Sequence, residues 1–225
     1  MVKLIAFFKR RIGMSVEDFQ RHWRTRHAAL VVRQSGLRRY IQNHTLLSAY
    51  DRSEPSYDGV AEAWFDDTDS MRALSSSPEF RAVQADESNF IDAKSIDSVI
   101  TDEVVIIDGT IPEDSVKMIA FLNKRPDVSF EFFQRYWRET HGPIASRIPG
   151  NRRYVQCHVR PGIYEAGRTP AYDGVPISWF ADVQALRDSG SSPEYAATRA
   201  DEANFMISGR LPFVIANALE IEIEH

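Results

Sequence analysis

Side chains that can carry acid–base chemistry recur in this chain as two sets with the same spacing. Each set holds a histidine, a tyrosine 13 residues later and a second histidine four residues after that. The six candidate catalytic residues are His27, Tyr40, His44, His141, Tyr154 and His158. An imidazole has an ordinary pKa of about 6.5, and a phenol can donate a hydrogen bond to an oxygen that gains negative charge. These residues therefore predict proton transfer.

Every one of these residues also has a purely structural interpretation. The first histidine of each set can cap carbonyl groups at a helix end, where the helix dipole favours its charged form. His44 and His158 can lie exposed at a strand end. Tyr40 and Tyr154 can pack their rings in a core with the hydroxyl bound to a neighbour. The sequence leaves both interpretations open.

Further residues near these sets are candidates for contact with a substrate. The strand expected at 38–44 alternates, so that Tyr40, Gln42 and His44 share one face and Ile41 lies on the other. A buried polar face is costly unless it is hydrogen-bonded or used. The candidate substrate-binding residues are Trp23, Gln42, Tyr57, Glu62, Trp137, Gln156 and Tyr172. The tryptophans are also typical core residues.

The acidic residues divide into two kinds. Glu62 has isoleucine, Ile177, at its matching position in the second set. A position that accepts isoleucine is not fully exposed, so Glu62 is predicted to be a semi-buried carboxylate with a raised pKa. The acidic pairs at 86–87 and 201–202 are instead expected on a solvated helix face.

The two sets belong to a domain-sized internal repeat. Residues 2–44 and 116–158 align without a gap, and 21 of the 43 positions are identical, which excludes chance. The alignment resumes further on after one inserted residue. The sequence therefore predicts two repeats, at 1–108 and 116–225, joined by a linker at 109–115.

Each repeat has the pattern of a small α+β unit. Residues 2–9 are rich in β-forming residues, and Ser15 caps a helix whose apolar stripe runs with a spacing of four to His27. In the second repeat Gly142-Pro143 follows the histidine and is expected to end the helix. Strands are expected at 38–44, 57–65 and 99–107, and helices at 68–74 and 77–91. The order is β-α-β-β-α-β, the ferredoxin-like pattern.

That order leaves one face of each four-stranded sheet without helices. Two such repeats can cover these faces by packing sheet to sheet about a pseudo-twofold axis, as an intramolecular dimer. A small ligand could then be held between the two sheets. The tyrosine, glutamine and second histidine of each strand would face this space, and the apolar residue between them would face the helices.

Composition restricts the classes of function. The net charge of −5 gives no footprint for nucleic acid, and no apolar run is long enough to span a membrane. The single cysteine excludes an intrachain disulfide, and a cytoplasmic location is expected. The motifs of phosphate loops, zinc proteases and serine hydrolases are absent from the sequence. We expect neither a metal nor a cofactor.

Taken together, the motifs resemble those of a tandem EthD-domain protein of the dimeric α/β barrel superfamily. The resemblance rests on Trp-x-x-x-His at the helix end, Arg-Arg-Tyr-x-Gln-x-His in the next strand, Tyr-Asp-Gly-Val and Ser-Pro-Glu. It covers nearly all of both repeats. The second repeat, with Gly142-Pro143 after its histidine, is closer to the usual pattern than the first, which has Ala28-Ala29.

The resemblance implies a barrel that binds a hydrophobic aromatic or phenolic small molecule. Related proteins include cofactor-free isomerases, cyclases, decarboxylases, dehydratases and quinone-forming monooxygenases. We expect a cofactor-independent lyase or isomerase that uses His and Tyr for C–C or C–O cleavage, such as decarboxylation, dehydration or retro-aldol loss. The alternatives are a monooxygenase of phenolic or anthrone-like rings, with or without haem, and a non-catalytic protein that binds an aromatic metabolite. Whether the duplicated chain forms a homodimer is left open.

Overall fold

The computed structural model describes residues 1–51 and 53–223, and its elements repeat the order β-α-β-β-α-β. The strands are β1 (Val2–Phe8), β2 (Leu37–Thr45), β3 (Gly59–Phe65), β4 (Asp97–Asp108), β5 (Val116–Ala120), β6 (Arg153–Val159), β7 (Gly174–Phe180) and β8 (Phe213–Ile221). Their hydrogen-bonded neighbours follow the order β1-β3-β2-β8-β5-β7-β6-β4, which closes into a barrel. The predicted fold class, α+β with two ferredoxin-like halves in a dimeric α/β barrel, is thereby confirmed.

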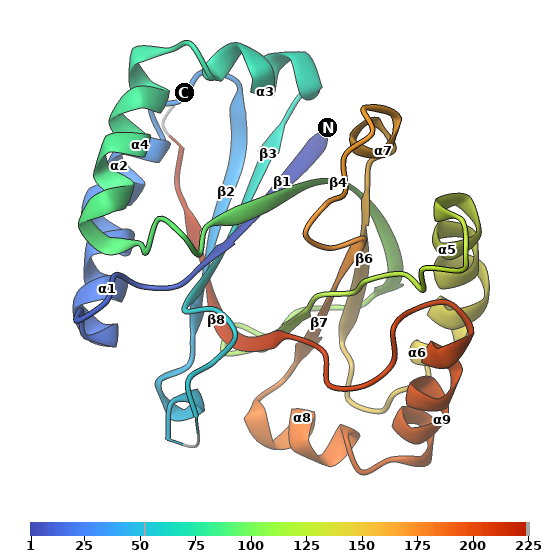
Figure 1. Cartoon of the computed structure of the whole chain (residues 1–225). Helices are drawn as coiled ribbons and strands as arrows, with labels where there is room; N and C mark the ends of the chain where they lie inside the picture. The colour runs from blue at the N-terminus through green and yellow to red at the C-terminus, as the bar shows by residue number, and fades with distance from the viewer. Residues whose placement is uncertain (52, 224–225) are drawn as a thin grey trace. The chain divides into compact units, whose positions relative to one another are not determined.

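Short helices connect these strands (Figure 1). They are α1 (Val16–His22), α2 (Ala28–Val31), α3 (Thr68–Leu74), α4 (Pro78–Phe90), α5 (Phe130–Tyr136), α6 (Gly142–Ala145), α7 (Gly162–Glu165), α8 (Val183–Ser189) and α9 (Pro193–Asp201). Serines cap the main helices as predicted. The Ser15 hydroxyl accepts a hydrogen bond from the backbone N–H of Asp18, and Ser77 accepts one from that of Phe80.

The chain forms two compact units whose limits differ from those of the sequence repeats. The first unit holds Met1–Thr101 and the chain from Asn217 onward, and the second holds Asp102–Ala216. Each of the long strands β4 and β8 is therefore divided between the two units. The repeat limits at 1–108 and 116–225 remain a prediction about the sequence repeat.

In each unit one strand is flanked by two antiparallel partners. In the first unit β3 lies between β1 and β2, so that Ala63 is opposite both Leu4 and Tyr40. In the second unit β7 lies between β5 and β6, and Ser178 is opposite both Met118 and Tyr154. These matching registers place equivalent residues of the two repeats at equivalent points of their sheets.

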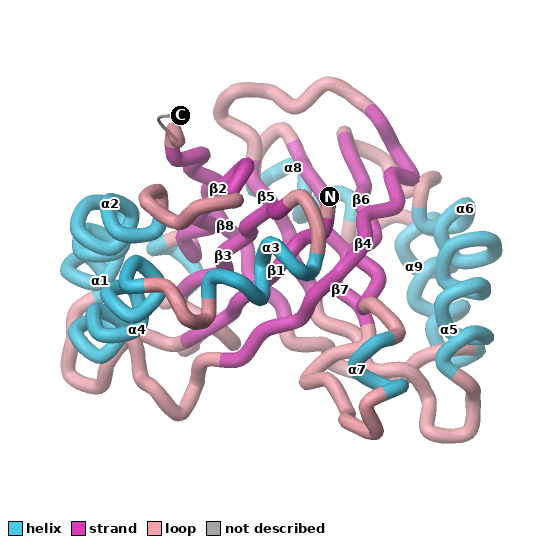
Figure 2. Tube along the Cα trace, turned by 90° about the horizontal axis from the view of Figure 1, so that it is seen from above, coloured by secondary structure: helices cyan, strands magenta, loops and turns pink. Residues whose placement is uncertain are grey.

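A helix layer covers one face of the strands in each unit. Helices α1, α2 and α4 lie side by side in the first unit, and α5, α6 and α9 lie side by side in the second (Figure 2). Aromatic residues fill the contact between layers, because Trp23 and Trp137 are fully buried and each packs beside a buried phenylalanine. The predicted core role of these tryptophans is confirmed.

Two glycines let these tryptophans approach the sheet. A Cβ atom at Gly59 would lie 2.6 Å from Cζ3 of Trp23, and one at Gly174 would lie 2.5 Å from Cζ3 of Trp137. The glycine of the Tyr-Asp-Gly motif is thus a point of close approach, as its position in a strand predicts.

The helix that carries each first histidine is longer than expected. It was predicted to end at Gly142-Pro143, but it continues through α6, and the matching helix of the first unit continues through α2. The continuation is possible because a π-helical turn precedes it, at Trp137–His141 and at Trp23–His27. The turn occurs in both units although proline stands in only one, so proline does not cause it.

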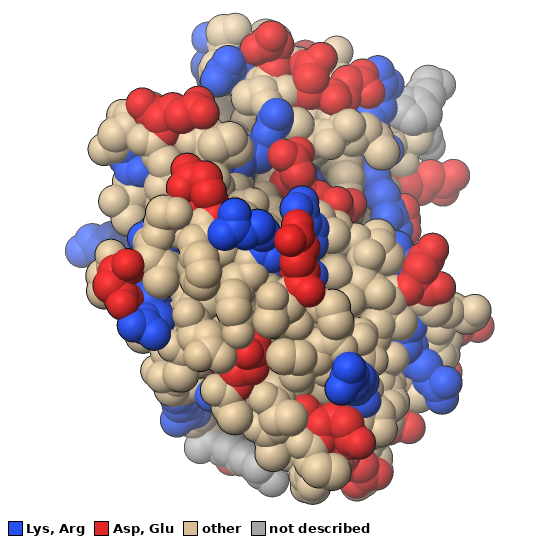
Figure 3. Space-filling model, turned by 90° about the vertical axis from the view of Figure 1, so that its right-hand side faces the viewer, with Lys and Arg blue, Asp and Glu red and all other residues tan. Residues whose placement is uncertain are grey.

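The surface and the helix lengths agree with the composition. On the face seen in Figure 3, acidic and basic side chains intermingle and neither sign dominates. Within the part of the chain that the structure describes, every helix is too short or too polar to cross a membrane.

Candidate active site

A cavity of about 260 Å³ lies inside the second unit, between its sheet and its helices. Strands β5, β6 and β7 form one wall, helices α6 and α9 form the other, and the loop before β8 closes one side. The lining includes Met118, Ala120, Trp137, His141, Ala145, Asn151, Tyr154, Pro176, Ser178, Thr198, Arg199 and Glu202. The volume is slightly below the usual range for ligand sites, about 300–1,000 Å³, so the cavity suits a small ligand.

His141 forms a buried pair with an aspartate at this cavity. Its Nδ1 lies 2.8 Å from Oδ2 of Asp201, and Tyr136 donates a hydrogen bond to Oδ1 of the same carboxylate. Burial lowers the pKa of His141 below its ordinary value, and Asp201 opposes this effect. With Nδ1 bound to the carboxylate, Nε2 is the nitrogen left for a ligand in the cavity. The residue can therefore act as a general base.

The π-helical turn determines where this histidine lies. The backbone carbonyl of Trp137, the first residue of this turn, accepts hydrogen bonds from the backbone N–H of Gly142 and from Nε2 of Gln156. A π turn adds a residue to the helix and rotates the side chains that follow, and such turns are frequent at functional sites. His141 is the last residue of this turn, so the turn directs it toward the cavity wall.

Two hydrogen-bond donors line the cavity, Tyr154 from the sheet and Trp137 from the helix layer. The Tyr154 oxygen accepts a hydrogen bond from Nε2 of Gln156 at 3.1 Å, so its own hydrogen remains free to donate. Burial raises the pKa of Tyr154 to about 12, which the nearby Gln156 and Trp137 N–H groups lower only in part, and the phenol is neutral. Among the described residues, Nε1 of Trp137 has no hydrogen-bond partner. Both donors could bind an oxygen of a ligand.

Two buried oxygens of the same cavity also lack partners among the residues described. Asn151 donates to the Ser178 hydroxyl at 3.2 Å, but its Oδ1 is unpaired. Glu202 accepts a hydrogen bond from Arg199 at 2.8 Å through Oε1, while its Oε2 is unpaired. Buried polar atoms are normally hydrogen-bonded, so these oxygens indicate that a polar ligand belongs in the cavity.

His158 and Gln156 lie behind Trp137 and do not line the cavity. The His158 ring packs on Trp137 with 4.4 Å between centroids, and its two nitrogens contact the side-chain oxygens of Gln156 and Gln134. Burial lowers the pKa of His158 to about 4, so it is neutral. The structure thus brings His141, Tyr154 and Trp137 together but places His158 and Gln156 in a supporting layer.

The first unit repeats the pair, but apolar side chains pack the positions equivalent to the cavity lining. His27 Nδ1 lies 3.0 Å from Asp86 Oδ2, and the other oxygen of this carboxylate contacts His22. Trp23 donates to the Tyr40 hydroxyl oxygen at 2.9 Å, so the indole N–H that is unpaired at Trp137 is paired in this unit. A hydrophobic cluster packs the equivalent space, and its members include Val31, Leu37, Tyr40, Ala63, Leu74, Val83, Leu4 and Phe80.

The predicted faces of β2 and β6 are wrong. Gln42 donates to the carbonyl of Trp23 and to the Tyr40 hydroxyl, and His44 stacks on the Trp23 ring. These side chains therefore lie on the face of the sheet that the helices cover, and not on the uncovered face where they were predicted. Ile41 lies on the other face of β2, where its cross-strand neighbour on β3 is Glu62. The reason is that the helix backbone supplies hydrogen-bond partners for the polar side chains.

The remaining candidates lie away from the cavity. Glu62 is 1 % exposed, forms an ion pair with Lys3 and accepts a hydrogen bond from Asn43, on the face of the sheet opposite Tyr40. Tyr57 packs on Phe7 and Tyr172 on Phe121, with 4.9 Å and 4.8 Å between ring centroids. None of these residues lines the cavity of the second unit.

The sequence interpretation missed two residues that line the cavity, Asn151 and Glu202, and Asp201, which binds His141. Asp201 and Glu202 were expected on a solvated helix face, but Glu202 is 5 % exposed and the Asp201 side chain is 10 % exposed. The sequence did contain a signal for Asp201 and Glu202, because the same acidic pair recurs at 86–87 in the first repeat. The spacing from the histidine to the acidic pair differs by only one residue between the repeats. Asn151 is not repeated, and its signal is instead the difference between the repeats, since leucine stands at the matching position.

The structure also bears on metal binding. In residues 1–51 and 53–223, no three His, Cys, Asp or Glu side chains converge as metal ligands.

Known proteins share the sequence pattern and the fold. The family model of the EthD domain matches residues 11–94 and 125–208. A solved anthrone oxidase-like protein superposes with a TM-score of 0.67 and 11% identity, over 98% of this chain and 93% of that chain.

Two bacterial structures give similar results. A candidate monooxygenase from Fusobacterium nucleatum has a TM-score of 0.60 and 7% identity, over 96% of this chain and 93% of its own. One from Lactobacillus acidophilus has a TM-score of 0.56 and 11% identity, over 98% and 99%. At these identities the likeness shows the fold alone. No curated protein was found to match the sequence.

Proposed function

The chain belongs to the EthD family, and we propose that it is an enzyme that moves a proton on a small aromatic or phenolic molecule in the cavity of its second half. Both His141 and Tyr154 lie at this cavity. The cavity wall is mainly apolar, with a few polar atoms that converge on one space, which is the usual character of a site for an aromatic ligand.

The observation that carries the proposal is the His141–Asp201 pair at the cavity. The aspartate holds Nδ1 at 2.8 Å and stabilises the imidazolium that forms when Nε2 takes up a proton. Partial burial acts against the Asp201 carboxylate, but hydrogen bonds from His141, Tyr136 and Asn204 keep its pKa below the ordinary value. The pair therefore combines a neutral base with a permanent negative charge behind it.

Tyr154 and Trp137 supply the complementary function. Removal of a proton from a phenol, or from a carbon next to a ring carbonyl, places negative charge on an oxygen. The free hydroxyl hydrogen of Tyr154 and the unpaired N–H of Trp137 can both stabilise that oxygen in a mainly apolar cavity. An aromatic ring spreads the remaining charge.

The anion so formed can follow two courses. Loss of a leaving group by C–C or C–O cleavage, or return of the proton to another atom, makes the protein a lyase or an isomerase. Reaction with dioxygen makes it a monooxygenase, in which a ring CH₂ and O₂ give a ring carbonyl and water. The descriptions of the structural neighbours favour this second candidate, since they are an anthrone oxidase-like protein and candidate monooxygenases.

A substrate screen with two detectors tests the proposal. Purified protein is incubated with a panel of phenols, hydroxy-aromatic acids and anthrones, while an oxygen electrode and mass spectrometry follow the reaction. Product without oxygen uptake identifies a lyase or isomerase, and uptake of one O₂ per product identifies a monooxygenase. Tight binding of an aromatic compound with no product from any panel member would overturn the enzyme proposal in favour of a binding protein.

A further inference from the structure

Glu202 is a buried carboxyl group in the cavity to which the proposed function gives no role. It is 5 % exposed, and one of its oxygens is bound by Arg199 at 2.8 Å. The other oxygen, Oε2, is buried and has no hydrogen-bond partner among the residues described. An unpaired buried oxygen destabilises a protein by about 1–3 kcal/mol, which a structural role alone would not require.

We propose that Glu202 is a second catalytic residue, an acid that gives a proton to a ligand oxygen while His141 removes a proton from the ligand. This inference rests on the proposed function, because it needs a ligand that His141 can deprotonate. The geometry supports it, since His141 and Glu202 line one cavity and a free atom of each, Nε2 and Oε2, is left for a ligand.

The step is an enolisation and it balances without any other reactant. Nε2 of His141 takes a proton from a ring CH₂ that is conjugated with a ring carbonyl, as the CH₂ across the central ring of anthrone is, and the C–H electron pair enters the ring as new C=C bonding. The carbonyl π electrons move to oxygen, which takes the proton of Glu202 Oε2. The products are the enol, the imidazolium of His141 beside Asp201, and the carboxylate of Glu202 beside Arg199.

The surrounding charges fit both ends of this step. Burial raises the pKa of Glu202 to about 7, the charge of Arg199 opposes the shift, and Asp201 adds to it. Tyr154 lines the same cavity from the sheet, and the Glu202 charge adds a small part to the raised pKa of that phenol. Arg210 lines the same cavity from the loop before β8. Glu202 can thus be protonated near neutral pH and still be stabilised once it has lost its proton.

The two groups define a pH window. His141 must be neutral, and burial lowers its pKa below 6.5, so this requirement is met above that lowered value. Glu202 must be protonated, which fails as the pH rises through about 7. Activity should therefore rise with pH through the His141 pKa and fall again near pH 7.

The first half offers a matched control residue. Glu87 occupies the position equivalent to Glu202, and burial raises its pKa to about 7 as well. Glutamine, Gln84, stands where Arg199 stands in the second half, and the space beside Glu87 is packed by the hydrophobic cluster around Val83. Replacement of Glu87 by glutamine should therefore change the same chemical group without touching the cavity.

Hydrogen exchange of anthrone in D₂O under argon tests the inference. The ring CH₂ exchanges through the enol, and NMR follows the loss of its signal without interference from oxidation. We expect the wild type to accelerate exchange, E202Q to be slower by about 10²–10⁴-fold, E202D to recover part of the rate and E87Q to equal the wild type. The wild-type profile should fall near pH 7, and E202Q should lack this alkaline limb.

The outcomes separate this inference from the proposed function. Wild type that leaves anthrone at the background rate overturns both. Wild type and E202Q that exchange equally fast overturn the role of Glu202 and leave the proposed function intact. Circular dichroism checks the fold of each variant. If E202Q fails to fold, the wild-type profile decides, because a rate that keeps rising above pH 8 overturns the acid role.

Discussion

The two halves of this chain keep the same histidine–aspartate pair but differ in what lies beneath it. In the second half His141 borders a cavity that contains unpaired polar atoms. In the first half His27 forms the same contact with Asp86, yet the space below is packed by side chains. The histidine ring packs on a phenylalanine at nearly the same distance in both halves, 4.7 Å and 4.8 Å between centroids. The pair alone therefore does not distinguish a site from a core.

A few exchanges account for the difference. Residues that are small or polar in the second half are larger or apolar at the equivalent positions of the first. The exchanges are Ala145 to Val31, Asn151 to Leu37, Ser178 to Ala63, Tyr195 to Phe80 and Thr198 to Val83. The exchange at Ala145 fills space, that at Asn151 removes an unpaired oxygen, and the other three each remove a hydroxyl group, so the equivalent positions of the first half are apolar.

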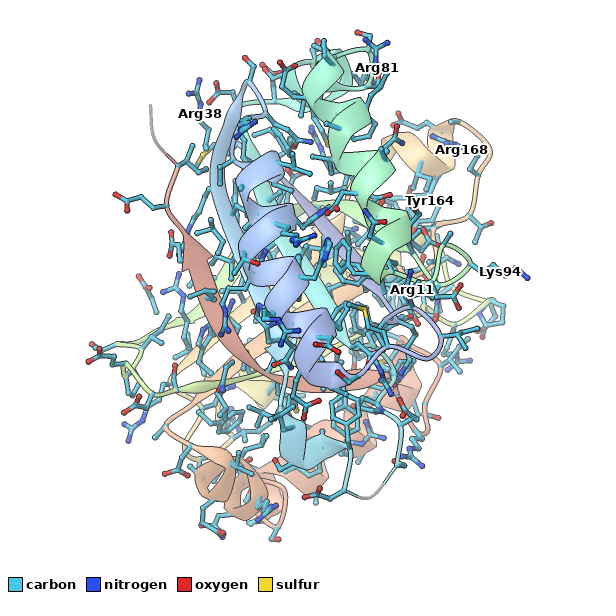
Figure 4. The ribbon with its side chains drawn as sticks, turned by 90° about the vertical axis from the view of Figure 1, so that its left-hand side faces the viewer. Arg11, Arg38, Arg81, Lys94, Tyr164 and Arg168 are labelled. Atoms are coloured by element: carbon cyan, nitrogen blue, oxygen red, sulfur yellow. The ribbon has the colours of Figure 1, made fainter. Side chains whose placement is uncertain are left out.

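The helix side of the first half shows this division of roles. Figure 4 views the α1, α2 and α4 layer, with Arg81 on α4 and Arg38 on β2. Below this layer Trp23 donates to the Tyr40 hydroxyl, so its indole N–H is not left for a ligand as that of Trp137 is. We infer that the first half stabilises the fold and the second half performs the chemistry.

The strongest way to break this division is to remove each histidine in turn. His141→Asn should lower turnover by about 10²–10⁴-fold, because it removes the general base. His27→Asn should leave turnover unchanged, since no substrate reaches it. Both are measured on a substrate from the screen, or by anthrone exchange. An equal loss in the two variants would mean that the first half is also active.

Exchange of Leu37 and Asn151 tests the halves through stability. Leu37→Asn places an amide in the packed cluster and removes apolar contacts, so it should lower the free energy of unfolding by about 2–5 kcal/mol. Asn151→Leu removes an unpaired buried oxygen and should raise that free energy by about 1 kcal/mol, at the expense of ligand affinity. Urea unfolding measures the change in stability, and ligand titration measures the change in affinity. A more stable Leu37→Asn variant or a less stable Asn151→Leu variant would contradict the division of roles.

The pH dependence of stability should show the halves behaving alike. Burial lowers the pKa of both His44 and His158 to about 4, so between pH 6.5 and 4 the unfolded chain binds protons that the folded chain does not. Stability is therefore complete above pH 6.5 and is lost as the pH falls, by up to about 3 kcal/mol for each residue. Urea unfolding at pH 5 and 7.5 measures the slope. His44→Gln and His158→Gln should each flatten it, and an unchanged slope would refute the burial effect.

The smallest predicted effect concerns the two glycines beneath the tryptophans. Gly59→Ala and Gly174→Ala should each lower the free energy of unfolding by about 1–3 kcal/mol, because the new methyl group overlaps the indole ring. Only Gly174→Ala should also lower activity, since Trp137 lines the cavity and Trp23 does not. Thermal unfolding measures the loss of stability, and the exchange assay measures activity. A loss of activity in both variants would contradict the prediction that only the Trp137 side affects the site.

Much of the fold could be predicted from the sequence because its signals are local. Ser15 and Ser77 begin helices by capping them, and the glycine of Tyr-Asp-Gly allows an aromatic ring to come close. The internal repeat then indicated two equivalent halves. The π-helical turns were not predictable, because they depend on hydrogen bonds such as that from Gln156 to the Trp137 carbonyl, which link distant residues.

The site was harder to predict because it depends on contacts across the fold. Both faces of β2 are buried, with Tyr40, Ile41 and Gln42 all at 6 % exposure or less, so alternation could not show which face meets the helices. The cavity results from small differences in side-chain volume between the halves. A comparison of the repeats for polar positions that become apolar would have indicated Asn151 and Thr198.

The division of β8 between the two units has a consequence for synthesis of the chain. Residues 217–221 belong to the first compact unit although they follow the second in sequence. The N-terminal unit therefore cannot be completed on the ribosome until this last strand has emerged. We expect nascent chains that stop at Ala216 to hold an incomplete, protease-sensitive first unit, so that its quality control depends on residues 217–221.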